Sequence, residues 1–153
     1  MKKQYTSIIL LTVLCLLLTG CKGKKVETTC KSSSKQTNYE INTKYTINSR
    51  KDIVESVKIN QTITSDDKKV LSDFEKQLKD QYKSNKSLYG GYTYNIKVKG
   101  KKLTSKVTIN YEKLDMKKFV KDNGAMKDYV DKDNNFTLEG AKKLYKSTGA
   151  KCE

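Results

Sequence analysis

Four segments of the chain alternate between apolar and polar residues, and this period of two restricts the fold more than any other feature. The segments begin near residues 39, 53, 92 and 103, and β-branched and aromatic side chains fill most of their apolar positions. Such alternation indicates strands with one buried face. Turn-forming residues at 48–52 and at 99–102 separate the members of each pair, so the sequence predicts two β-hairpins.

Helical spacing replaces alternation after each hairpin. Residues 66–84 carry an apolar stripe, and Ser65 before them is the predicted N-cap. A short amphipathic segment begins at Asp115, and a last helix starts after the cap Thr137 and ends at Gly149. The sequence therefore predicts an α+β fold, with a four-stranded antiparallel sheet in ββα-ββαα order and its helices packed on one face.

The first residues have the features of an export signal. Two lysines precede an apolar stretch at residues 8–18, which is shorter than the ~20 residues needed to span a bilayer. The run Leu18-Thr19-Gly20-Cys21 resembles a bacterial lipobox, in which the cysteine receives a diacylglycerol and becomes the first residue after cleavage. We expect residues 1–20 to be a lipoprotein signal peptide and Cys21 to be the lipid attachment site, on the extracytoplasmic face of the cell membrane.

The rest of the chain is expected to contain a tether and one domain. Residues 21–38 are rich in lysine and serine and nearly free of apolar side chains, which predicts a polar tether before a single domain at 39–153. Cys30 and Cys152 form an even pair in an exported chain, so we expect a disulfide that closes nearly the whole domain. A redox pair is the alternative, although the spacing is not Cys-x-x-Cys.

The chain is strongly basic. It has 32 Lys plus Arg against 17 Asp plus Glu and a formal net charge of +15, which becomes +13 when Lys2 and Lys3 leave with the signal. Outside the cell such a surface meets anionic lipid headgroups and wall polymers rather than nucleic acid. Arg50 is the only arginine in the sequence. Because lysine lacks the guanidinium group that forms bidentate hydrogen bonds with an anion, we expect diffuse electrostatic binding. Simple solubilisation by lysine is the alternative.

The sequence contains few of the side chains and motifs that enzymes use for catalysis. The sequence has no histidine, which excludes His-dependent triads, Cys-His dyads and His-rich metal sites. Residues 131–135 imitate the start of an EF-hand loop, but Phe136 replaces the required glycine and Lys142 the bidentate glutamate, so we expect no metal. No activated nucleophile or Gly-rich phosphate loop is recognisable. We therefore expect no enzyme activity and no cofactor.

Tyrosine is the commonest aromatic residue, with ten copies against three Phe and no Trp. Tyr89, Tyr92 and Tyr94 cluster at the start of the third strand and are candidate ligand contacts, because tyrosines among lysines can bind sugars or phosphates. Packing within the sheet is the alternative. A second function hypothesis is a small-molecule or lipid carrier with an apolar pocket between sheet and helices, lined by Tyr92, Tyr94, Phe74 and Met126.

Several features stand together in this chain, namely the lipobox at Cys21, the first hairpin, the helix from about Asp66, the strand Tyr92–Val98, the segment Lys106–Asp115 and the ending Leu144–Ala150. The combination resembles the YehR-like family of small bacterial lipoproteins. The chain departs from that family in carrying Cys30 and Cys152, and in Asn110 where an acidic residue is usual.

The resemblance implies a membrane-anchored α+β domain without an established activity, and it offers no catalytic residue to carry over. Our leading hypothesis is a non-enzymatic module that binds an anionic envelope component or a partner protein at the membrane surface.

Overall fold

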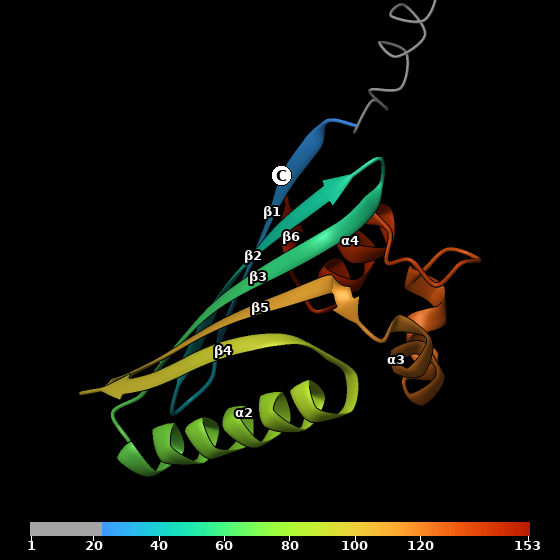
Figure 1. The fold of residues 1–153 in the computed structure, drawn as a ribbon. Helices are drawn as coiled ribbons and strands as arrows, with labels where there is room; N and C mark the ends of the chain where they lie inside the picture. The colour runs from blue at the N-terminus through green and yellow to red at the C-terminus, as the bar shows by residue number, and fades with distance from the viewer. Residues whose placement is uncertain (1–22) are drawn as a thin grey trace, which may run out of the picture.

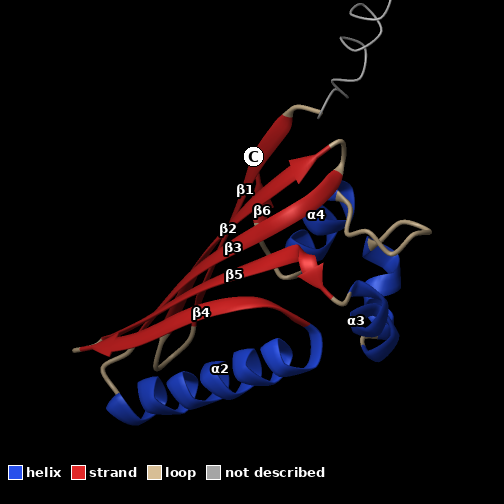
Figure 2. Cartoon of the chain, viewed as in Figure 1, coloured by secondary structure: helices blue, strands red, loops and turns tan. Residues whose placement is uncertain are grey.

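The computed structural model describes residues 23–153, so the expected signal peptide and Cys21 lie outside the described residues. Figure 2 shows a long twisted sheet with helices at its side. The elements in chain order are β1 (Lys25–Lys35), β2 (Glu40–Arg50), β3 (Ile53–Thr64), α2 (Lys68–Tyr89), β4 (Gly90–Lys99), β5 (Lys102–Leu114), α3 (Met116–Asp122), the 3-10 helix η2 (Gly124–Tyr129), α4 (Leu138–Ser147) and β6 (Lys151–Cys152).

The sheet has six strands in the order β4-β5-β3-β2-β1-β6, and every neighbouring pair is antiparallel. The α+β class agrees with the sequence, but the predicted four-stranded sheet in ββα-ββαα order is wrong. Two hairpins are present as predicted, β2–β3 and β4–β5. The additional strands are β1 and β6, which lie together at one edge (Figure 1).

β1 occupies most of the segment expected to be a tether, so that expectation is wrong for residues 25–35. The strand pairs with β2 over its whole length, from Lys25 opposite Arg50 to Lys35 opposite Glu40. Its buried positions are Thr28 and Cys30, which are 6% and 0% exposed. Because these inward side chains are small or polar, β1 shows none of the apolar alternation that revealed the other strands.

β6 comprises only two residues, too few for any periodic pattern. It pairs with the middle of β1, Cys152 opposite Cys30 and Lys151 opposite Lys31. Glu153 continues the contact: its backbone N–H donates to the Thr29 carbonyl at 2.9 Å. The C-terminus is therefore fixed to the edge of the sheet.

The helices cover one face of the sheet, and the core lies between the two layers (Figure 1). Leu71 of α2 packs against Ile63 and Leu103 at one end of the sheet. Ala141 and Tyr145 of α4 pack against the other end, where β1, β2 and β3 supply the buried residues. The strands point alternate side chains away from this core, and these side chains form the opposite face of the sheet.

Candidate functional site

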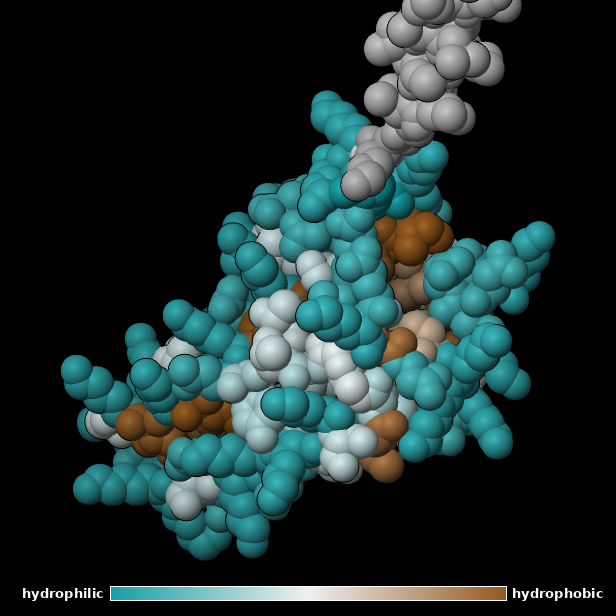
Figure 3. All heavy atoms as spheres, viewed as in Figure 1, coloured by the Kyte–Doolittle hydropathy of each residue, from teal (hydrophilic) through white to brown (hydrophobic). Residues whose placement is uncertain are grey.

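The face of the sheet that carries no helix is polar and rich in lysine. We call this surface the lysine face. Its exposed lysines include Lys31, Lys35, Lys44, Lys58, Lys97, Lys99, Lys102, Lys106 and Lys151. Threonine, serine and asparagine occupy the remaining central positions. On the side of the molecule visible in Figure 3, hydrophobic residues reach the surface only in separate patches among hydrophilic side chains.

Strand register aligns part of this face into a single row across all six strands. Each member of the row lies directly opposite the next, and the order from β6 to β4 is Lys151, Lys31, Lys44, Asn60, Lys106 and Asn95. Neighbouring strands lie ~4.8 Å apart, so five intervals give the row a length of about 24 Å. We call this set the central row.

No ion pair within the described residues neutralises the lysines of the central row. Like charges directly opposite one another destabilise a sheet, and Lys31 has a lysine opposite it on both sides. Among residues 23–153, the ion pairs involve other basic residues and none of the lysines named above for the lysine face. Glu27, Glu40 and Glu153 lie on the same face but outside the central row. The face therefore carries an uncompensated positive potential suited to an anion.

Two hollows follow the central row and meet at Asn60. The larger has a volume of about 710 Å³ and includes Lys151, Lys31, Lys44 and Asn60 in its lining. The second has a volume of about 360 Å³ and includes Asn60, Lys106 and Asn95. Every residue of the central row thus lines one hollow or both, and we call the two hollows, which share Asn60, the trough.

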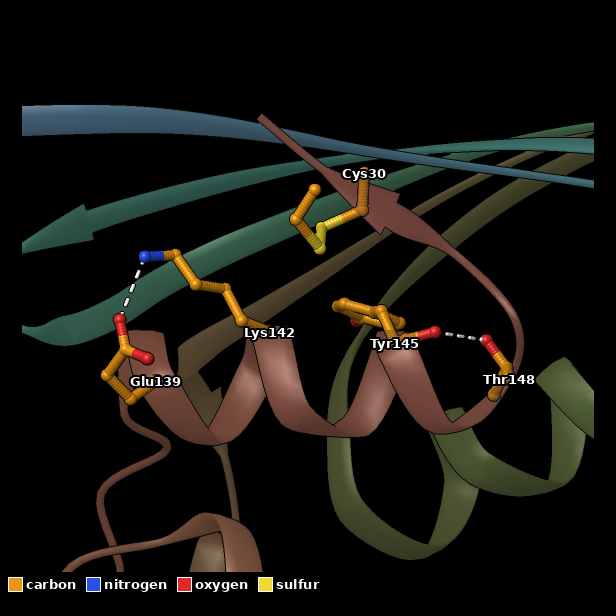
Figure 4. Close-up of a disulfide and its surroundings, with 6 residues drawn as sticks. Cys30, Glu139, Lys142, Tyr145 and Thr148 are labelled. Carbon is orange, nitrogen blue, oxygen red and sulfur yellow. Dashed lines mark hydrogen bonds and ion pairs between the residues drawn. A yellow bond between two sulfur atoms is a disulfide. The ribbon is translucent and has the colours of Figure 1, made fainter.

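The predicted disulfide between Cys30 and Cys152 is confirmed. Figure 4 shows it facing α4, close to Tyr145. Both cysteines belong to the cluster formed by α4 and the first strands, and Cys30 is completely buried. Because Lys151 precedes Cys152, the disulfide also holds one end of the central row in place.

The three tyrosines predicted as ligand contacts lie on the helix-bearing side, where they pack. Tyr89 is 9% exposed and contacts Phe119 edge-on, with ring centroids 5.1 Å apart. Tyr92 is 5% exposed, and half-buried Tyr94 lies against Tyr82 of α2. The structure therefore favours the packing alternative for all three. Sequence reasoning missed the central row, whose only local signal was lysine at alternate strand positions.

The residues proposed to line an apolar carrier pocket are dispersed. Tyr92 and Tyr94 belong to the cluster beside α2, whereas Phe74 packs at the far end of the sheet. Met126 belongs to the cluster beneath α4. The four side chains thus belong to three different clusters of the core, and nothing in this arrangement favours a carrier.

The EF-hand-like segment is held together by its own hydrogen bonds. The Asp131 carboxylate accepts hydrogen bonds from the backbone of Asp133 and from both the backbone and side chain of Asn135. These bonds, those from Asn135 first, lower the pKa of Asp131 below its ordinary value. Within residues 23–153, no group of three or more acidic, Cys or His side chains is arranged to hold a metal ion.

Burial of tyrosines makes the fold sensitive to alkali. Burial raises the pKa of Tyr92 to about 12 and raises those of Tyr111 and Tyr145 well above the ordinary value near 10. Above about pH 10 the unfolded chain therefore loses phenolic protons that the folded chain keeps.

We expect the free energy of unfolding to be constant up to about pH 9.5 and then to fall, by up to about 1.4 kcal/mol per pH unit for each such tyrosine. Urea unfolding at a series of pH values measures this. A Tyr145→Phe variant should show a shallower fall, and an equal slope in both proteins would contradict the assignment.

No helix in the described part of the chain combines the length and apolar character needed to cross a membrane. No family model and no curated protein sequence matches this chain. Among solved structures, the NMR structure of the Escherichia coli YehR protein superposes with a TM-score of 0.55 at 20% identity, over 84% of this chain and 91% of YehR. A protein from Streptococcus pneumoniae TIGR4 gives a TM-score of 0.47 at 16% identity, over 86% and 87% of the two chains. The chain therefore has a YehR-like fold.

Proposed function

We propose that this protein is a lipid-anchored, extracytoplasmic binding module without enzyme activity, which takes an anionic component of the cell envelope on its lysine face. The observation that carries the proposal is the central row. Four lysines cross six strands there with no carboxylate among them, and a fold that tolerates such repulsion gains from an anionic ligand.

Anchoring at Cys21 is compatible with the start of the sheet. β1 begins at Lys25, and the carbonyl of Gly23 accepts a hydrogen bond of 3.1 Å from Arg50 at the end of β2. A lipid on Cys21 would thus hold the sheet close to the membrane by a short segment. Intact mass of the exported protein tests this step, because a diacylglycerol on Cys21 after removal of residues 1–20 has a defined mass.

Binding is tested by sedimenting the purified mature protein with isolated bacterial envelopes at increasing salt. A row variant, K31Q/K44Q/K106Q, should bind about 100-fold more weakly than the parent at low salt, since each lysine near an anionic surface contributes about 1 kcal/mol. The parent itself should dissociate as salt rises, because the interaction is screened.

A helix variant, K76Q/K83Q/K117Q, is the matched control. It removes the same charge from exposed positions of α2 and α3, away from the lysine face. We expect it to bind nearly as well as the parent. If the two variants lost the same affinity for envelopes, only the net charge of the protein would matter. If the row variant still bound envelopes at high salt, the proposal would be rejected.

A further inference from the structure

We propose that the ligand is a linear polyol-phosphate polymer that lies across the strands in the trough of the central row. This inference rests on the proposed function and specifies its ligand. The trough is open, about 24 Å long, and lined from end to end by residues of the row. A single phosphate or headgroup would occupy one strand interval or two, whereas an extended polymer engages all the lysines together.

The side chains present suit phosphodiesters separated by hydroxyl groups. Lysine binds phosphate as a flexible point charge, and four lysines and no arginine stand in the central row. Asn60 and Asn95 interrupt the lysines of the row, and Thr62 and Thr108 line the same hollows. These amides and hydroxyls are donors and acceptors for the polyol units between charges.

The position of the row favours a polymer above the membrane over the lipid headgroups themselves. Lys31 is six residues beyond Lys25, so the row crosses β1 about 20 Å from the end of the strand that is nearest to Cys21. Screening at physiological ionic strength acts over about 8 Å. If the strands stand upright on the bilayer above an anchor at Cys21, the headgroups would lie beyond the range of these lysines, whereas a polymer above the membrane would lie within it.

The experiment compares four probes with the mature protein by titration calorimetry. They are poly(glycerol phosphate) long enough to cross six strands, glycerol 3-phosphate, vesicles containing phosphatidylglycerol, and poly-glutamate. We expect the polymer to bind at least about 100-fold more tightly per phosphate than the monomer, because linked sites act together. Vesicles and poly-glutamate should each bind at least about tenfold more weakly than the polymer.

An off-row variant, K35Q/K97Q/K102Q, tests whether the polymer crosses the strands along the row, because it removes three charges from the same face outside the central row and outside both hollows. The row variant should lose about 100-fold in affinity for the polymer, and the off-row variant about fivefold or less. Circular dichroism and thermal unfolding confirm that both variants fold, as their exposed positions predict.

The outcomes separate this inference from the proposed function. Equal losses in row and off-row variants, with the helix variant unaffected, would keep the lysine face as the site but reject the path along the row. Tighter binding to vesicles or to poly-glutamate would replace the polymer by a lipid surface or a polycarboxylate. No binding of any probe, with envelope binding unchanged in the row variant, would reject both.

Discussion

Replacing Cys30 and Cys152 together by alanine is expected to lower the free energy of unfolding by about 4 kcal/mol. The bond joins residues separated by 122 positions, so its loss gives the unfolded chain much more conformational freedom. The folded state also loses, since β6 is only two residues long and its remaining attachment is a few backbone hydrogen bonds to β1. Urea unfolding of parent and variant measures the difference.

Two further measurements decide whether the disulfide is the cause. A thiol count with intact mass, with and without reductant, tests whether the bond is formed in the purified protein. The parent under reductant should then match the alanine variant in stability, and amide exchange should accelerate first at residues 151–153. A loss below about 1 kcal/mol would mean that the C-terminal edge is held by other contacts.

The disulfide also links stability to the proposed site. Release of β6 removes Lys151 from the central row but leaves Lys31, Lys44 and Lys106 in place. Affinity for an anionic polymer should therefore fall by about fivefold in the alanine variant, the contribution of one lysine, rather than vanish. The disulfide between Cys30 and Cys152 thus stabilises the fold, and its loss would shorten the proposed anion-binding site.

The elements predictable from the sequence are those whose buried side chains are large. In β2, Tyr45 and Ile47 face the core, and in β5, Val107 and Ile109 do the same, so alternation is visible. β1 buries only Thr28 and Cys30, and pairing with β2 along its whole length stabilises it. This pairing depends on another part of the chain. Local pattern therefore could not find it.

The N-termini of α4 and α2 likewise divide into one that neighbouring residues determine and one that depends on a tertiary contact. Thr137 caps α4 as predicted, and its hydroxyl oxygen accepts a hydrogen bond of 2.9 Å from the Gly140 N–H. The predicted cap Ser65 instead donates to the Asn38 carbonyl, a contact between distant segments, and Asp67 caps α2. A cap that competes with a tertiary hydrogen bond cannot be assigned from its neighbours in sequence.

The candidate site was the least predictable feature, although its charge was evident. Lysines at alternate positions indicate one polar face of each strand, but only strand register places Lys44 beside Lys31 and aligns Lys106 with Asn60. Two of the row's lysines, Lys31 and Lys151, come from the strands that the sequence did not reveal. Diffuse basic character was thus foreseeable, whereas an ordered row was not.

Replacing Phe136 by alanine is expected to cost about 4 kcal/mol of unfolding free energy. The ring is 1% exposed and packs on Tyr111, with ring centroids 4.8 Å apart. Its segment joins η2 to α4 and is attached to the sheet by a 2.9 Å hydrogen bond from the Val54 N–H to the Phe136 carbonyl. Loss of the ring leaves a cavity where this irregular segment meets the core.

Two comparisons make the Phe136 result specific. Leu88→Ala, at a side chain 46% exposed, should change stability by no more than about 0.5 kcal/mol. Burial is the main reason that the pKa of Tyr111 is raised, so opening the cavity beside it should move that pKa back toward its ordinary value. Ultraviolet titration of the folded variant measures this shift. A stability loss without any change in tyrosine titration would mean that the core refills around Tyr111, and the cavity explanation would then be wrong.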